Sequence, residues 1–317
     1  MTALLVLSAA DMRDVVTVSP LATAQGGASL GLASGERIRV RDLMYALMLQ
    51  SANDAAVALA EHVAGSVEGF VNRMNRRARA MGLRDTRFRS PNGLDDRGYS
   101  TARDLAQITT WALRNPDVAR IARTKHHEMP SPDGTTRRLQ NRNALLWLYP
   151  GTFGVKSGFT SAAGSCLVAA AERDDLRLAS VVLGAPAEAF SDAATLLDWG
   201  FTTFELRRVV IEGERFDPVK VGGSEVVLEA AGTVKVLVRR GAEVRRTVEL
   251  APGVTLPIAP GDRLGEVLVT APGGRELGRT PAVSVESVSV VEELPWAPRM
   301  WERAAGFLAA MFQSLLA

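Results

Sequence analysis

Cysteine, lysine and long apolar runs are scarce in this 317-residue sequence, and each scarcity excludes something. The single cysteine, Cys166, cannot form an internal disulfide, so oxidising and reducing compartments are both permitted. No stretch reaches the roughly eighteen uninterrupted apolar residues that cross a bilayer as a helix. A formal net charge of +2 gives no electrostatic reason to expect nucleic acid as a partner. Nearly all basic residues are arginines, so a lysine inside a motif is informative.

The opening residues, MTALLVLSAA, admit two interpretations. The run ALLVLSAA has the length of a signal-peptide core, but only Met1 and Thr2 precede it, and a secretory signal normally begins with a basic residue. A helix that packs into a protein core fits the composition better.

The hydrophobic periodicity divides the chain into three parts. Residues 1–204 mix helical and strand patterns, and FGVKSG, SCLVAAAE and LRLASVVLG read as adjacent antiparallel strands. Residues 205–291 consist of short β-branched runs separated by Gly and Pro turns, which predicts an all-β sandwich domain. Residues 292–317 form an amphipathic helical pattern that begins with tryptophans and carries few charges. We expect an anchor lying in a membrane interface there, in preference to a helix docked on the β-domain.

Two short motifs are candidates for chemistry. Ser51-Ala52-Asn53 interrupts two apolar helical stretches, and Lys156-Ser157-Gly158 lies on an apolar strand before Phe159 and Thr160. Taken singly, a serine near an asparagine is ordinarily a helix cap, and a lysine at a strand end is ordinarily solvated. Together, and in this order, they match the second and third motifs of the penicillin-recognising serine enzymes, which use S-x-x-K, S-x-N and K-[ST]-G.

The resemblance extends along nearly the whole chain. QSANDAAVALAEHVAG, NGLDDRGYSTARDLA, LQNRNALLW, GVKSGFTSAAGSCLVAAA and LLDWGFTTFE resemble segments of the D-alanyl-D-alanine carboxypeptidases, the low-molecular-mass penicillin-binding proteins. The resemblance implies an α/β (α+β) β-lactamase-like transpeptidase domain with an antiparallel sheet flanked by helices. It also implies the C-terminal β-sandwich and the amphipathic tail.

The resemblance further implies a role for each motif residue. Ser51 would relay a proton to the leaving amine, and Asn53 would orient the catalytic lysine and the substrate amide. Lys156 would supply a fixed positive charge near the substrate carboxylate, which is worth more in a dry cleft than in water. The remaining implied substrate contacts are the Ser157 hydroxyl, the strand carrying Gly158, Phe159 and Thr160, and the guanidinium of Arg142. A surface salt bridge is an equally reasonable interpretation of Arg142.

The sequence departs from the family pattern in two places. A second family arginine aligns with Ala189, which puts part of the carboxylate binding in doubt. No S-x-x-K is present, since none of the four lysines has a serine three residues before it. In the family that motif opens a helix whose continuation reads like MTALLVL. We therefore expect a chain truncated before its nucleophile, either by a start assigned at an internal methionine, which we prefer, or as an inactive copy. Missing strands would leave an unpaired sheet edge.

The implied activity is serine-type D-Ala-D-Ala carboxypeptidation of peptidoglycan stem peptides on the outer side of the cytoplasmic membrane, with β-lactam binding. A non-catalytic wall-binding homologue and a β-lactamase of the same fold are the alternatives. We expect no cofactor. We expect no metal either, because His126 and His127 are consecutive on a predicted strand and point to opposite faces.

Overall fold

The computed structural model describes residues 1–187 and 189–289. The predicted tail helix at 292–317 lies outside the described residues. Contacts divide the chain into two compact units, Met1–Glu205 and a second that begins at Leu206. Each unit has its own apolar core, so each is described separately.

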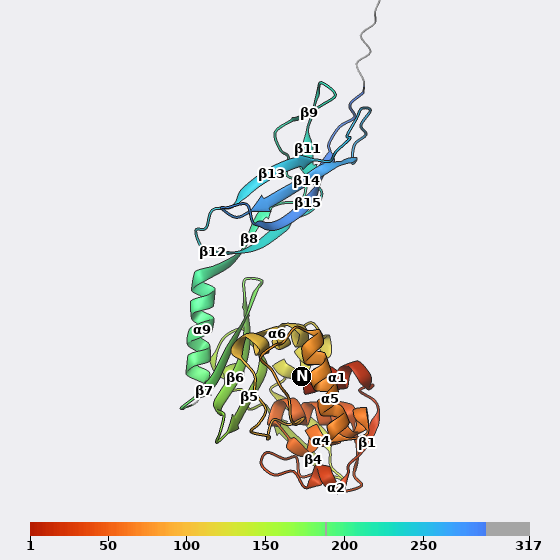
Figure 1. The fold of residues 1–317 in the computed structure, drawn as a ribbon, viewed down its shortest axis with the longest axis vertical. Helices are drawn as coiled ribbons and strands as arrows, with labels where there is room; N and C mark the ends of the chain where they lie inside the picture. The colour runs from red at the N-terminus through yellow and green to blue at the C-terminus, as the bar shows by residue number, and fades with distance from the viewer. Residues whose placement is uncertain (188, 290–317) are drawn as a thin grey trace, which may run out of the picture. The chain divides into compact units, whose positions relative to one another are not determined.

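The first unit combines helices with a three-stranded antiparallel sheet (Figure 1). Its elements are α1 (Thr2–Ala9), β1 (Val15–Thr17), α2 (Pro20–Thr23), β2 (Arg37–Arg39), α3 (Val40–Tyr45), η1 (Ala46–Gln50), α4 (Asn53–Ala64), α5 (Val67–Ala80), α6 (Ala102–Leu113), α7 (Pro116–Arg123), β3 (His126–Pro130), β4 (Thr136–Gln140), α8 (Leu145–Leu148), β5 (Thr152–Thr160), β6 (Gly164–Arg173), β7 (Leu176–Ala185) and α9 (Phe190–Thr203). The sheet order is β5-β6-β7, as the three apolar runs predicted.

Helix α4 forms the centre of this unit. Its residues from Asn53 to Ala60 are all buried, and α1 packs against it through the fully buried Val6. The opening residues are therefore the core helix that their composition indicated.

Local capping sets the ends of the next helices. The Ser66 hydroxyl accepts a hydrogen bond from the Gly69 amide at the start of α5, and Thr101 does the same for the Asp104 amide at the start of α6. Helix α5 ends before Gly82, whose φ of +74° reverses the chain at little cost for glycine. The residue types at these three positions are those that ordinarily start and end helices.

Both outer strands of the sheet lack a second neighbour among the described residues. Strand β6 lies in the middle: β5 pairs with one of its edges and β7 pairs with the other. Along β7, Leu183 is 39% exposed. Figure 1 shows α9 running along β7, where Ser180 donates a hydrogen bond to the Ala193 carbonyl of α9.

The second unit is all β over residues 206–289. Its strands are β8 (Phe204–Val210), β9 (Val219–Val221), β10 (Ser224–Val226), β11 (Leu228–Ala230), β12 (Val234–Arg239), β13 (Arg245–Leu250), β14 (Arg263–Thr270) and β15 (Glu276–Ser284). A four-stranded sheet, β11-β15-β14-β13, and the β8–β12 pair share one core of valines. Buried and exposed residues alternate along β12, because successive side chains of a strand point to opposite faces. Strand β12 therefore has one face in the core and one in solvent.

Candidate active site

Ser51 lies at a break between two buried helical segments. Helix α3 continues as a π-helical turn, η1, and α4 begins two residues after that turn ends. Between them Ser51 adopts φ +57° and ψ +36°, a left-handed conformation that costs a residue with a side chain of order 1 kcal/mol. Such a residue persists where its surroundings fix it, which is typical of functional sites.

Lys156 of β5 reaches the Ser51 side chain across 105 positions of sequence. Its Nζ donates hydrogen bonds to Ser51 Oγ and to the carbonyl oxygen of Ser157. The two motifs singled out in the sequence therefore meet in space, and a hydroxyl and an ammonium share one half-buried position.

The environment of Lys156 favours its neutral form. Removal from water is the larger cause and the positive charge of Arg142 the smaller one, and together they lower its pKa from 10.5 to about 8. At neutral pH the amine therefore still carries its charge, while it can lose the proton just above that pH. An amine with a pKa in this range can hold an anion or exchange a proton.

Asn53 is turned towards a neighbouring loop. Its side-chain Nδ2 donates a hydrogen bond to the Gly26 carbonyl at 2.8 Å, and its backbone amide donates to the Ala28 carbonyl at 2.8 Å. A Cβ on Gly27 would come within 3.1 Å of Asn53 Nδ2, and Gly27 also has a positive φ, so glycine suits the loop there. Residues 26–28 thus wrap closely around the start of α4.

Asp54 is the site residue that the sequence motifs do not identify. It is 1% exposed, and its carboxylate accepts hydrogen bonds from Ser29 Oγ (2.6 Å) and from the amides of Leu30 (3.0 Å) and Leu32 (3.1 Å). It also accepts a hydrogen bond from the Ala55 amide in the first turn of its own helix at 2.9 Å. An aspartate in the first helical turn was the only signal, and that signal does not specify a distant loop.

Within the described residues, the backbone of Arg142, not its side chain, is hydrogen-bonded next to Ser51. Its amide donates to the Leu49 carbonyl at 2.9 Å, which fixes residue 142 beside the turn that presents Ser51. The side chain is exposed, and no ion pair is recorded for it in residues 1–187 and 189–289. Its charge is nevertheless felt by Lys156.

The strand beyond Lys156 is open to solvent. Phe159 is 73% exposed, and a Cβ on Gly158 would meet no atom within 4 Å. Thr160 Oγ1 accepts a hydrogen bond from the Ala163 amide at the turn into β6. No neighbouring atom in the described part of the chain therefore requires glycine at 158.

Ala189 and the two consecutive histidines, His126 and His127, make structural contacts. Ala189 is buried at the start of α9, where its amide donates to Ser165 Oγ of β6 at 3.3 Å. His127 stacks on Tyr45 and contacts Asp42 Oδ1 at 3.1 Å, and His126 packs edge-on against Trp147. Both histidines thus connect the β3–β4 hairpin to its neighbours.

The lowered pKa of Lys156 predicts a stability effect. The folded-state pKa, about 8, lies below the unfolded value of 10.5, so the unfolded chain binds more protons between these pH values and stability rises with pH across that window. Below pH 8 the half-buried ammonium is a cost. Lys156→Met should therefore raise the free energy of unfolding at pH 7 by about 1–3 kcal/mol, the lower end allowing for partial exposure. The gain should vanish towards pH 10.5.

Thermal unfolding of both proteins at pH 7, 9 and 10.5 measures this effect. Lys125→Met is the matched control, because Lys125 is exposed and its stability change should be small at every pH. A Lys156→Met protein less stable than the parent at pH 7 would contradict the assignment.

Comparisons with known proteins agree on one family. Residues 1–187 match the family model described as D-alanyl-D-alanine carboxypeptidase. The chain is 31% identical over 302 residues to D-alanyl-D-alanine carboxypeptidase DacF of Bacillus subtilis, covering 91% of this chain and 77% of that protein. It is 34% identical over 308 residues to DacC of Escherichia coli, covering 92% and 75%. Penicillin binding protein 5 from Haemophilus influenzae superposes with a TM-score of 0.66 at 29% identity, covering 91% of this chain and 89% of that one.

Proposed function

We propose, because the chain belongs to the D-alanyl-D-alanine carboxypeptidase family, that the crevice between Ser51 and Lys156 binds a peptidoglycan stem peptide ending in D-Ala-D-Ala. By family the protein is a serine-type carboxypeptidase that binds penicillin. The observation that carries the assignment of the crevice is the contact of the Lys156 ammonium with the Ser51 hydroxyl.

The reaction proceeds through an ester. A serine hydroxyl attacks the carbonyl carbon between the two D-alanines, the peptide C–N bond breaks, and D-alanine leaves after its amine gains a proton. Water then hydrolyses the ester and frees the serine. In this family the nucleophile and its lysine base belong to S-x-x-K, a motif that the 317 printed residues do not contain.

Ser51 and Lys156 serve the leaving group in this proposal. The Ser51 hydroxyl passes a proton to the departing amine, and Lys156, in contact with it, holds the hydroxyl in place. Asn53, at the start of α4, orients the substrate amide while its Nδ2 is retained by Gly26. A preorganised set of this kind acts by stabilising charge that develops in the transition state.

Strand β5 receives the peptide backbone. Its outer edge has no strand partner within the described part of the chain, and an extended peptide can add to such an edge by main-chain hydrogen bonds. The open space at Gly158 admits that approach, and the Phe159 amide contributes to the oxyanion hole. The Ser157 hydroxyl and Arg142 bind the terminal carboxylate. Arg142 does so alone, because Ala189 replaces the second family arginine.

Acylation by a fluorescent penicillin tests this function. A longer polypeptide that carries S-x-x-K directly ahead of residue 1 should be labelled and should release D-alanine from a stem-peptide substrate. Residues 1–317 alone should remain unlabelled, because no serine lies three residues before a lysine. Absence of labelling in the longer polypeptide would reject the assignment.

The cellular setting follows from the family. Family members act on the cell wall, so we place the enzyme at the extracytoplasmic face of the cytoplasmic membrane, in the periplasm where one exists. Residues 292–317 form the proposed surface anchor. Among the described residues, no helix is both long and apolar enough to cross a membrane.

A further inference from the structure

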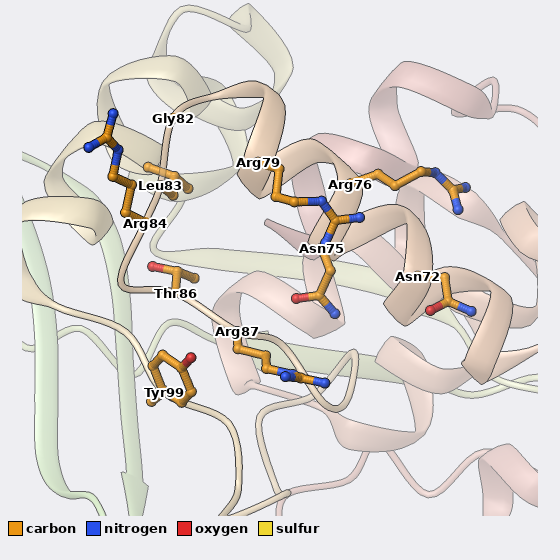
Figure 2. A pocket seen from close by; sticks show the side chains of 10 residues that line it. All are labelled: Asn72, Asn75, Arg76, Arg79, Gly82, Leu83, Arg84, Thr86, Arg87 and Tyr99. Atoms are coloured by element: carbon orange, nitrogen blue, oxygen red, sulfur yellow. The ribbon is translucent and has the colours of Figure 1, made fainter.

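A cavity whose lining includes neither Ser51 nor Lys156 lies between α5 and the loop that follows it. Its volume is about 760 Å³, within the range of small-molecule sites. The helix contributes Asn72, Asn75, Arg76 and Arg79, and the loop contributes Arg84 and Arg87. Figure 2 shows Asn75 and Arg79 extending from the helix towards the loop that carries Thr86 and Arg87. None of these residues has a part in the proposed carboxypeptidase chemistry.

The helical wall of this arginine pocket is built by sequence spacing. Positions 72, 75, 76 and 79 are separated by three, four and seven residues from the first, so they share one face of α5. The opposite face buries Phe70, Met74 and Ala78 in the core. The polar face is therefore held rigidly outward.

The loop wall is fixed by hydrogen bonds. Asn75 binds Phe88 twice: its Nδ2 donates to the Phe88 carbonyl at 2.8 Å, and its Oδ1 accepts from the Phe88 amide at 2.9 Å. Arg87 and Tyr99 form a β-bridge with amide-to-carbonyl distances of 2.8 and 3.1 Å. The backbone of the loop wall is thus fixed before any ligand arrives, which lowers that part of the entropy cost of binding.

The charge of the pocket is unbalanced. Four arginines line it and no carboxylate does. Arg76, Arg79, Arg84 and Arg87 have no recorded ion pair in the described part of the chain, whereas Arg97, Arg120 and Arg137 pair with nearby carboxylates. Two acids lie near the loop without lining the cavity: Asp85, between Arg84 and Thr86, is exposed, and Asp104 is buried and accepts a hydrogen bond from Thr86 Oγ1 at 2.6 Å.

The helix dipole explains only part of this cluster. Cations in the last turn of a helix interact favourably with its carbonyl end, which accounts for Arg79. It does not account for Arg87, which lies on the bridged loop. Gathering four like charges in a lining that holds no carboxylate costs free energy, and a bound anion would offset that cost.

We propose that the arginine pocket binds a polyanion that carries several phosphate groups. Guanidinium groups pair with phosphate oxygens in a bidentate manner, and Arg is the residue that suits this geometry. A single carboxylate would neutralise only one of the four charges. A chain of phosphates matches both the charge and the volume of the cavity, and the phosphates are supplied by a soluble phosphate chain or by lipid headgroups.

Isothermal titration of the full chain with inorganic tripolyphosphate tests the proposal. The pocket variant Arg76→Gln/Arg79→Gln/Arg87→Gln should bind at least about tenfold more weakly, since charge-assisted hydrogen bonds are lost. The matched control Arg37→Gln/Arg39→Gln/Arg103→Gln removes the same charge from exposed arginines elsewhere in the first unit and should bind like the parent. Unchanged thermal unfolding of the pocket variant verifies that it folds.

Three results would overturn the proposal: no tripolyphosphate binding by the parent, equal weakening in both triple variants, or citrate binding as tightly as tripolyphosphate. Co-sedimentation with vesicles distinguishes the source of phosphate. If phosphatidylglycerol vesicles, but not phosphatidylcholine vesicles, retain the parent and lose the pocket variant, the ligand is a lipid headgroup. Tripolyphosphate binding without retention on vesicles identifies a soluble phosphate chain.

Discussion

Lys156→Ala, introduced into a polypeptide that carries S-x-x-K ahead of residues 1–317, is expected to slow acylation by a fluorescent penicillin by about 10²–10³-fold. The ammonium is in contact with Ser51 Oγ and, in the proposed function, faces the carboxylate of the ligand. Because Lys156 and Ser51 are half-buried, a charge there stabilises an anion more than it would in water. Rates of labelling under single-turnover conditions measure the effect.

The pH dependence separates loss of charge from loss of structure. The pKa of Lys156 is about 8 in the free protein, so labelling by the parent should fall as pH rises through that value and the amine loses its proton. Lys156→Ala should lack this step. Lys125→Ala, which changes an exposed lysine of the same unit, should keep both the rate and the step. A parent-like rate in Lys156→Ala would remove the basis for the proposed crevice.

Asp54→Ala is expected to lower the free energy of unfolding of the first unit by about 3–5 kcal/mol. The change leaves the amides of Leu30 and Leu32 without their carboxylate partner, and each orphaned buried donor costs about 1–3 kcal/mol. The free energy of unfolding of Asp54→Asn should lie between those of the parent and Asp54→Ala. The asparagine amide retains one acceptor oxygen, but its NH₂ group is a donor that faces other donors.

Urea unfolding followed by tryptophan fluorescence measures this loss in the first unit, where Trp111, Trp147 and Trp199 lie. Glu68→Ala is the control, since Glu68 also occupies the first turn of a helix but is exposed, and should change stability by under about 0.5 kcal/mol. If Asp54→Ala stays within about 1 kcal/mol of the parent, the carboxylate does not organise the loop over the start of α4.

The sequence predicted the elements around the site with good accuracy where a local signal exists. Serine and threonine are residue types that start helices and glycine is one that ends them, and the structure places caps at Ser66 and Thr101 and a chain reversal at Gly82. The apolar runs around Lys156 predicted three adjacent antiparallel strands, which are β5, β6 and β7. Capping and periodicity depend on residues within one or two turns, so they are legible in a single sequence.

Other features had no such signal. The break at Ser51-Ala52-Asn53 was visible, but the left-handed conformation of Ser51 follows from how η1 and α4 pack. From the sequence alone, the arginines of α5 are only a charged helix face. The loop that completes the pocket is held beside α5 by the contact of Asn75 with Phe88 and by the bridge between Arg87 and Tyr99, and neither has a local sequence signal. The roles of Asn53, Ser157 and Arg142 in binding stay predictions.

The sequence by itself determined the family, the helical and strand segments of the first unit, the all-β character of the second, and the pair of motifs that carry chemistry. Only the tertiary structure decided that Ser51 and Lys156 touch, that Asp54 holds the neighbouring loop, and that the pKa of Lys156 falls to about 8. The physical reason is that burial and contact sum over segments far apart in the chain. The Lys156 amine is partly removed from water because strand β5 places it against the helix break at residue 51. These two segments are 105 positions apart, so no window of local sequence contains both.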